Sequence, residues 1–318
     1  MSSRANPFLP TTARRRPLVV GHRGVPLLHQ ENSLAGFRRA VALGIPAVEL
    51  DVRLTADGRA VVFHDRDVAR LTDGHGEVCD LTWDELARLR LRRVLPMGVA
   101  ADGTTVEVTY ARSEPIALLA EVLAELAGKV AINVELKIGL PRWWDVAMAA
   151  VAARDIAAAD ATADVIVTSF DPRKLRRARQ VHPGLVTGFA WDDTMLDGAA
   201  PLLDRLGPRL APGARGRGLL TRAIGGDLAG RVLGTQAVGA DHTLVHGDVV
   251  TRLHRAGVGI GTHTLFPLGS TTGKRLAPTA SSDGEVARLI ELGVDWIESD
   301  DPERLLALVD RAPAATSG

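Results

Sequence analysis

The sequence is poor in several features that mark particular classes of protein. Its 318 residues include one cysteine, Cys79, which excludes an internal disulfide framework and fits a reducing cytoplasm. No stretch reaches the roughly 18 uninterrupted apolar residues of a membrane span. The arginine-bearing N-terminus is not followed by the apolar run of a secretory signal. We therefore expect a soluble, cytoplasmic protein with no stable membrane insertion.

The sequence also lacks an excess of charge of either sign. It has 38 basic and 38 acidic residues, so no overall field attracts nucleic acid or an anionic membrane, and any anion site must be local. With no basic helix and few aromatic residues (5 Trp, 6 Phe, 1 Tyr), nucleic-acid binding is not expected. Lysine is rare, at four residues, so a lysine within a polar motif is informative.

What the sequence does contain is a repeated alternation of strand and helix patterns. Hydrophobic residues make up 46% of the chain and charged residues 24%, which is enough to bury a sizeable core. Eight short apolar runs, from PLVVGH to DWIESD, are mostly separated by helical patterns. This order is typical of a parallel sheet. It predicts a (β/α)8 barrel first, and an open doubly wound sheet second.

The expected domain organisation is one barrel with short extensions. We expect a flexible N-terminal arm at 1–16, a barrel domain at 17–312 and a C-terminal tail at 313–318. Residues 65–112 are too long for a simple connection and predict an insertion after the second strand. Two further stretches, 207–236 and 267–284, are predicted to be long loops, the first a possible lid.

Carboxylates occur at alternate positions in two of the predicted strands. In PAVELDVRL, Glu49 and Asp51 share one face, and INVELKIG places Glu135 and Lys137 on one face in the same way. Adjacent buried carboxylates repel each other unless a cation lies between them. Three hard oxygen ligands without a Cys or His pattern favour Mg²⁺ or Ca²⁺ over structural zinc.

Histidines end two of the apolar runs. His22 and Arg23 lie in VVGHRG, and His64 lies in AVVFHD. Each alone is more often a turn, hydrogen-bonding or surface residue than a catalytic one. In a parallel barrel, however, groups at strand ends converge at the catalytic rim. Together with the carboxylates and Lys137, these three residues predict one polar site.

The motifs resemble those of the glycerophosphodiester phosphodiesterase family. The matching stretches are HRG followed by EN-x-L-x-x-F, then VELDVRLTADGRAVVFHD, and then NVELK. The resemblance implies a (β/α)8 barrel with a small insertion after the second strand. It also implies that Glu49, Asp51 and Glu135 hold a divalent metal. His22 and His64 would be the general acid and base, and Arg23 and Lys137 would bind the phosphate.

The expected function is therefore metal-dependent hydrolysis of glycerophosphodiesters to sn-glycerol 3-phosphate and an alcohol. Water or a neighbouring glycerol hydroxyl can attack phosphorus, the latter through a cyclic phosphate, and the residues are compatible with both routes. Two alternatives are a phospholipase D-like or lysophospholipid-specific enzyme that uses the same centre, and a barrel that has lost activity and only binds. Retention of all the polar positions disfavours the inactive barrel.

One departure from the family pattern concerns the alcohol site. Where the family commonly has Trp-Thr-x-Asn at the seventh strand, this chain has His263-Thr-Leu-Phe. The substitution spares the predicted metal centre and leaves the bound alcohol open. His263 is a candidate substrate contact, and a packed strand histidine is an equal alternative.

Overall fold

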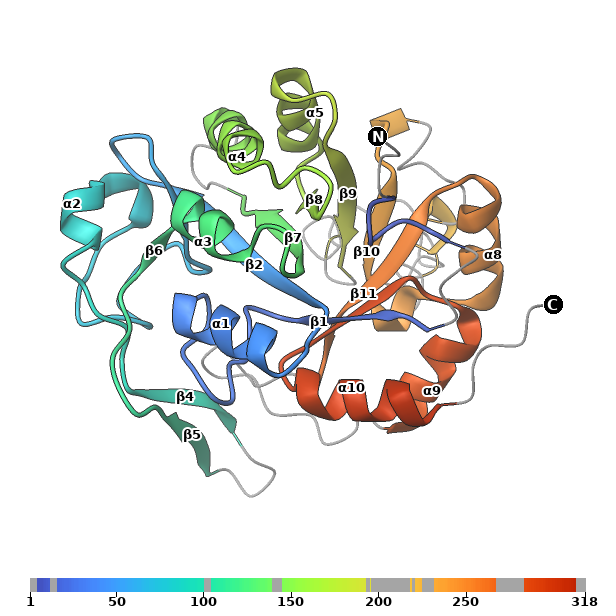
Figure 1. Ribbon diagram of the computed structural model, residues 1–318, viewed down its shortest axis with the longest axis horizontal. Helices are drawn as coiled ribbons and strands as arrows, with labels where there is room; N and C mark the ends of the chain where they lie inside the picture. Colours follow the sequence, from blue (N-terminus) through green and yellow to red (C-terminus); the bar gives the residue numbers. More distant parts are fainter. Residues whose placement is uncertain are drawn as a thin grey trace, which may run out of the picture.

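The protein forms a closed barrel of eight parallel strands in the computed structural model (Figure 1). The structure describes residues 5–11, 16–99, 104–138, 145–192, 195, 218, 221–224, 232–266 and 283–312. The barrel strands are β1 (Leu18–Gly21), β2 (Ala47–Leu54), β7 (Ala131–Leu136), β8 (Val165–Ser169), β9 (Val186–Trp191), β10 (Ala237–Asp241), β11 (Gly259–Leu265) and β12 (Trp296–Ser299). The barrel closes because β1 pairs with both β12 and β2. This confirms the predicted (β/α)8 barrel over the open sheet.

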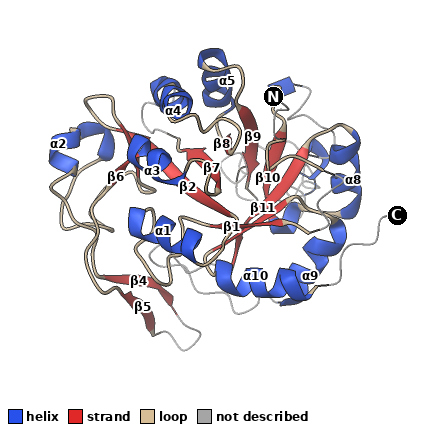
Figure 2. Cartoon of the chain, in the orientation of Figure 1, coloured by secondary structure: helices blue, strands red, loops and turns tan. Residues whose placement is uncertain are grey.

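Helices surround the barrel on its outer side (Figure 2). They are α1 (Leu34–Ala42), α3 (Leu119–Leu126), α4 (Ala147–Ala158), α5 (Pro172–Val181), α8 (Gly247–Arg255), α9 (Asp283–Leu292) and α10 (Pro302–Arg311). Side chains at Ser33, Asp171 and Asp301 cap α1, α5 and α10 by accepting backbone N–H groups of the first turn. Among the described helices, none combines the length and apolar character needed to cross a bilayer.

The amino ends of the strands are sealed by apolar side chains. Val20, Ala47 and Trp296 pack there with Phe8, whose ring lies edge-on to the Trp296 indole at a centroid distance of 5.6 Å. Phe8 is fully buried, and the Asn6 amide donates to the carbonyl of Val165 at 2.8 Å. Residues 5–11 of the expected flexible arm therefore pack against the barrel, because an aromatic side chain completes its apolar floor. This corrects the expectation for that segment.

The segment between β2 and β7 forms a subdomain at one side of the barrel, on the left in Figure 1. It contains the elements β3 (Ala60–Val62), η1 (Val78–Asp80), α2 (Trp83–Leu86), β4 (Val94–Val99), β5 (Thr105–Thr109) and β6 (Ala117–Leu118). Phe63, Leu71 and Leu86 belong to its own apolar core, and the Tyr110 hydroxyl donates to the carbonyl of Pro26 at 2.7 Å. The structure thus places most of this subdomain in the predicted insertion, 65–112. Most of the predicted loops 207–236 and 267–284, and the tail at 313–318, lie outside the described residues.

Candidate active site

Three carboxylates meet inside the carboxyl end of the barrel. Strands β2 and β7 are paired so that Asp51 lies opposite Glu135, and Glu49 lies two residues earlier on the same face of β2. Glu49 and Asp51 are buried and Glu135 is half-buried. One oxygen of each lies within 4.8 Å of the others. The structure therefore brings together the predicted metal ligands.

Positive groups flank this cluster. The ammonium of Lys137 lies 2.9 Å from Asp51 Oδ1 and 2.7 Å from Glu135 Oε1. The backbone N–H of Arg23 donates to Glu49 Oε2 at 2.9 Å, and its guanidinium Nε lies 3.1 Å from Asp51 Oδ2. These contacts place the two predicted phosphate ligands directly beside the carboxylates.

The carboxylates differ in their electrostatic environment. Burial raises the pKa of Glu49 well above its ordinary value, and the charges of Asp51, Glu298 and Glu135 add to the rise. Burial also opposes ionisation of Asp51, but Lys137, His64 and Arg23 outweigh it and hold its pKa well below the usual range. Glu49 is therefore the member of the cluster that most lacks a positive neighbour.

The arrangement fits a bound cation. Glu49 Oε1 is buried and has no hydrogen-bond partner among the described residues, which is costly for a carboxylate oxygen. Carboxylate oxygens are the donors that hard divalent cations prefer. Glu49, Asp51 and Glu135 are thus suited to hold a hard divalent cation.

Both predicted histidines lie at the rim, each with a carboxylate at Nδ1. His22 Nδ1 is 2.6 Å from Asp300 Oδ1, and its Nε2 is 3.8 Å from Glu49 Oε2. His64 Nδ1 is 2.7 Å from Asp65 Oδ1. A carboxylate at Nδ1 favours the tautomer with the proton on that atom, so Nε2 is the atom that can exchange a proton in each ring. Burial lowers the pKa of His64, and the charges of Arg23 and Lys137 add to the decrease.

A second layer of residues supports these groups. Glu31 accepts from the Arg23 guanidinium at 2.8 Å and from Arg70 at 3.0 Å, and Arg70 also pairs with Asp65. The Asn32 amide donates to Asp51 Oδ2 at 2.8 Å. Glu31 and Asn32 are the EN of the quoted motif, which was a signal for them. Sequence reasoning missed Arg70 and Asp300, because they reach the site only through the fold.

The backbone at the end of β1 explains the His-Arg-Gly sequence. Arg23 and Asn32 both adopt left-handed conformations, with φ of 55° and 59°. Strand β1 ends at Gly21, where an added Cβ would lie 2.3 Å from the carbonyl oxygen of Gly24. The tight turn therefore requires glycine and presents the Arg23 N–H to Glu49.

His263 lies on β11, two residues beyond Gly261, which faces the barrel interior against Trp296. Its ring packs against Phe170 at a centroid distance of 6.1 Å. His263 Nε2 is buried without a hydrogen-bond partner among the described residues. It also helps to lower the pKa of Glu298, although burial of that carboxyl raises it overall. The His263 ring is packed against Phe170, as expected for a packed strand histidine. Its unpartnered Nε2 is compatible with the other expectation, a substrate contact.

Comparisons with known proteins place the chain among related sequences. Residues 22–304 match the model of the glycerophosphoryl diester phosphodiesterase family. A glycerophosphodiester phosphodiesterase of Caldanaerobacter subterraneus is 32% identical over 177 residues, which cover 55% of this chain and 67% of that protein. Glycerophosphodiester phosphodiesterase 1 of Rattus norvegicus is 42% identical over 89 residues, covering 26% and 27%. The matches thus span from about a quarter to about two thirds of these relatives.

Solved structures share the fold. A putative glycerophosphoryl diester phosphodiesterase of Silicibacter pomeroyi has a TM-score of 0.67 at 22% identity, covering 96% of this chain and 95% of that one. A phosphodiesterase of Oleispira antarctica, in complex with the product sn-glycerol-3-phosphate, has a TM-score of 0.65 at 20% identity, covering 93% and 97%. At these identities the likeness supports the barrel architecture.

Proposed function

Because the chain belongs to the glycerophosphoryl diester phosphodiesterase family, we propose that it hydrolyses glycerophosphodiesters to sn-glycerol 3-phosphate and an alcohol with the help of a divalent metal. Membership confirms the predicted family and the predicted enzyme class, a phosphoric diester hydrolase. The observation that carries the proposal is the cluster of Glu49, Asp51 and Glu135, with an unpartnered buried oxygen, beside Lys137 and Arg23.

The charges of the site match those of the substrate. With a divalent cation bound, all three carboxylates would be ionised, and together with Arg23 and Lys137 the site would carry a charge of +1. A phosphodiester carries −1, so the complex would be close to neutral. A cation held there would polarise a phosphoryl oxygen and stabilise the charge that develops on it. Arg23 and Lys137 would hold the remaining phosphate oxygens in place.

The two histidines would move the protons. One histidine would take the proton of the attacking hydroxyl as the base, and the other would protonate the departing alkoxide as the acid. The proposal is compatible with either residue in either role. Asp300 and Asp65 hold Nδ1 of each ring, so that Nε2 takes or gives the proton. The attacking hydroxyl would be that of water or of the neighbouring glycerol carbon, and His263 would contact the alcohol.

The test is the turnover of glycerophosphocholine by the whole chain with Mg²⁺ or Ca²⁺ present. His22→Ala and His64→Ala should each lower kcat roughly 100- to 10,000-fold, as expected for loss of a general acid or base. His182→Ala is the matched control, because His182 lies at the end of α5 and bonds to Thr162. Activity near that of the wild type in either rim variant would contradict the acid and base roles.

Metal binding has a readout that does not depend on turnover. A divalent ion at about 100 times its Kd should stabilise the folded protein by about 2.7 kcal/mol. The ion should therefore raise the melting temperature of the wild type. Glu135→Gln should lose most of that increase, because it removes one ligand of the cluster. Equal stabilisation of Glu135→Gln and wild type would place the ion elsewhere.

A further inference from the structure

A second cavity lies beside the active site, between the end of β2, the N-terminal parts of α4 and α5, and η1 of the insertion. Its volume is about 170 Å³, roughly ten times or more what a single water requires. Its charged and sulfur-bearing lining residues are Arg53, Arg66, Cys79, Asp145, Met148 and Lys174. Three of these are cationic and one is acidic.

Lys174 is the most unusual of these cations. Its side chain is 1% exposed, and its ammonium donates to the carbonyl of Lys137 at 2.5 Å and lies 3.8 Å from Met148 Sδ. Within the described chain, no carboxylate forms an ion pair with it. Burial lowers its pKa to about 8, although the charges of Asp171 and Asp145 oppose the decrease. A buried ammonium that has only neutral partners is costly unless an anion compensates it.

Arg53, another lining residue of the cavity, also has backbone carbonyls as partners. Its Nε donates to the carbonyl of His64 at 2.8 Å, and one terminal nitrogen lies 3.5 Å from the carbonyl of Ile138. It too forms no ion pair with a carboxylate in the part of the chain that is described. Arg66, by contrast, pairs with Glu77. The cavity is thus lined by two cations that donate hydrogen bonds to backbone carbonyls and form no direct ion pair among the described residues. Carboxylates act on them only without contact, Asp171 and Asp145 on Lys174, and Asp51, Asp65 and Glu135 on Arg53.

We propose that this cavity is a second anion site, which binds a small oxyanion of the phosphate class between Lys174 and Arg53. An ammonium and a guanidinium together suit the tetrahedral, multiply charged oxygens of phosphate or a phosphomonoester. The site is distinct from the phosphodiester centre, because the Lys137 ammonium contacts Asp51 and Glu135 while its carbonyl contacts Lys174. The proposal does not depend on catalysis at that centre.

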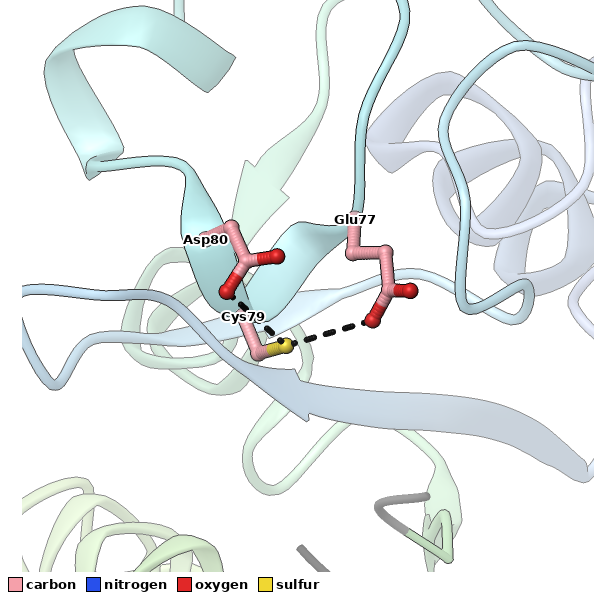
Figure 3. A group of neighbouring side chains, drawn as sticks. All are labelled: Glu77, Cys79 and Asp80. Carbon is pink, nitrogen blue, oxygen red and sulfur yellow. Dashed lines mark hydrogen bonds between the residues drawn. The ribbon is translucent and has the colours of Figure 1, made fainter. Parts of the chain in front are cut away.

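Cys79 offers a reporter within the cavity, since it is the only cysteine of the sequence. Figure 3 shows its sulfur between Glu77 and Asp80, at 3.6 and 3.7 Å from their oxygens. Iodoacetate and iodoacetamide alkylate the same thiolate but differ in charge. The ratio of their rates therefore measures how strongly the cavity attracts an anion, whatever the fraction of thiolate.

The experiment measures this ratio at constant ionic strength, with and without inorganic phosphate. The iodoacetate-to-iodoacetamide ratio should fall roughly three- to tenfold in Lys174→Met, and Lys129→Met should match the wild type. Lys129 is a suitable control because it is an exposed lysine paired with Glu125. Phosphate should slow both reagents in the wild type and neither in Lys174→Met. A parallel titration with sn-glycerol 3-phosphate separates free phosphate from a phosphomonoester as the preferred ligand.

Two further variants keep the outcome decisive. Arg53→Gln should behave as Lys174→Met does, so the test survives if one of the two fails to fold. His22→Ala should keep the phosphate protection, even though it should lose turnover. Equal ratios in wild type and both cavity variants, or no protection by phosphate, would overturn the second site. Protection that disappears in His22→Ala would place the phosphate at the phosphodiester centre and also overturn it.

Discussion

At the scale of single residues, the site depends on partners that fix reacting groups in position. His22 directly follows β1, but its orientation is set by Asp300, which follows β12 and is 278 residues away in the sequence. The 2.6 Å contact holds the Nδ1 proton and directs Nε2 toward Glu49. Asp300 is thus a positioning residue for the proposed proton transfer.

Asp300→Asn should lower kcat at least about tenfold with little change in KM, because the substituted amide no longer enforces the same tautomer of His22. Separate measurement of kcat and KM for glycerophosphocholine checks this. Asp301→Asn is the control, since Asp301 caps α10 and asparagine caps equally well. Equal kcat values for Asp300→Asn and wild type would show that His22 keeps its orientation without the carboxylate.

At the scale of elements, one glycine of a barrel strand leaves room for the side chain of the neighbouring strand. On β11, an added Cβ at Gly261 would lie 1.9 Å from Trp296 Cε2, so the indole occupies the space that a side chain would fill. Its register partner on β10, Gly239, has no heavy atom of the described residues within 4 Å of such a Cβ. The two glycines therefore serve different purposes, although both lie in strand interiors.

Gly261→Ala should lower the free energy of unfolding by about 3 kcal/mol or more, because the added methyl forces Trp296 out of the barrel floor. Gly239→Ala, the matched control, should change it far less. Urea unfolding of both variants measures the difference. A small effect at Gly261 would mean that the indole can move without cost.

The attachment of α9 to the barrel predicts a dependence on pH. Glu285 on α9 lies 2.8 Å from His242 Nδ1 and pairs with Arg288, which also donates to the carbonyl of Val245. Hydrogen bonds from Arg288 lower the pKa of Glu285 to about 2, against an opposing effect of burial, and His242 adds to the decrease. A carboxyl with a lowered pKa contributes stability above about pH 4.5 and loses it as the pH falls toward 2.

Glu285→Gln should therefore be less stable than the wild type by about 1 kcal/mol at neutral pH, a value reduced by partial exposure of the pair. The gap should narrow as the pH falls from 4.5 to 2. Urea unfolding at several pH values gives the comparison, with exposed Glu303→Gln as the control. A gap that stays constant with pH would contradict the ion-pair explanation.

At the scale of the whole molecule, the two ends of the barrel have opposite character. The amino end is closed by Phe8 and Trp296, and the carboxyl end carries the carboxylates, histidines and cations. Stability and chemistry are therefore separated along the barrel axis. The insertion contributes to the carboxyl end of the barrel, because its Arg70 contacts Glu31 and Asp65 at the rim.

Phe8→Ala should lower the free energy of unfolding by about 3 to 5 kcal/mol, as for other buried aromatic side chains. The variant should keep kcat/KM at a temperature where it is folded, because the floor lies away from the rim. Val232→Ala, at a position with 69% exposure, should change neither quantity. A loss of kcat/KM in folded Phe8→Ala would show that the two ends are coupled.

The barrel could be predicted from the sequence, because strand and helix periodicities are local patterns. The carboxylate cluster could be predicted as well, because alternation fixes which side chains of β2 and β7 share a face. The HRG, ELD, FHD and ELK motifs made the family recognisable, because each is a local pattern of neighbouring residues. The partners of these groups, by contrast, follow from the folded arrangement of the chain. Barrel closure brings Asp300 to His22, the insertion brings Arg70 to Glu31, and α5 brings Lys174 to the carbonyl of Lys137. Such contacts join distant segments, so no local pattern encodes them, and the same is true of Phe8 beneath the barrel.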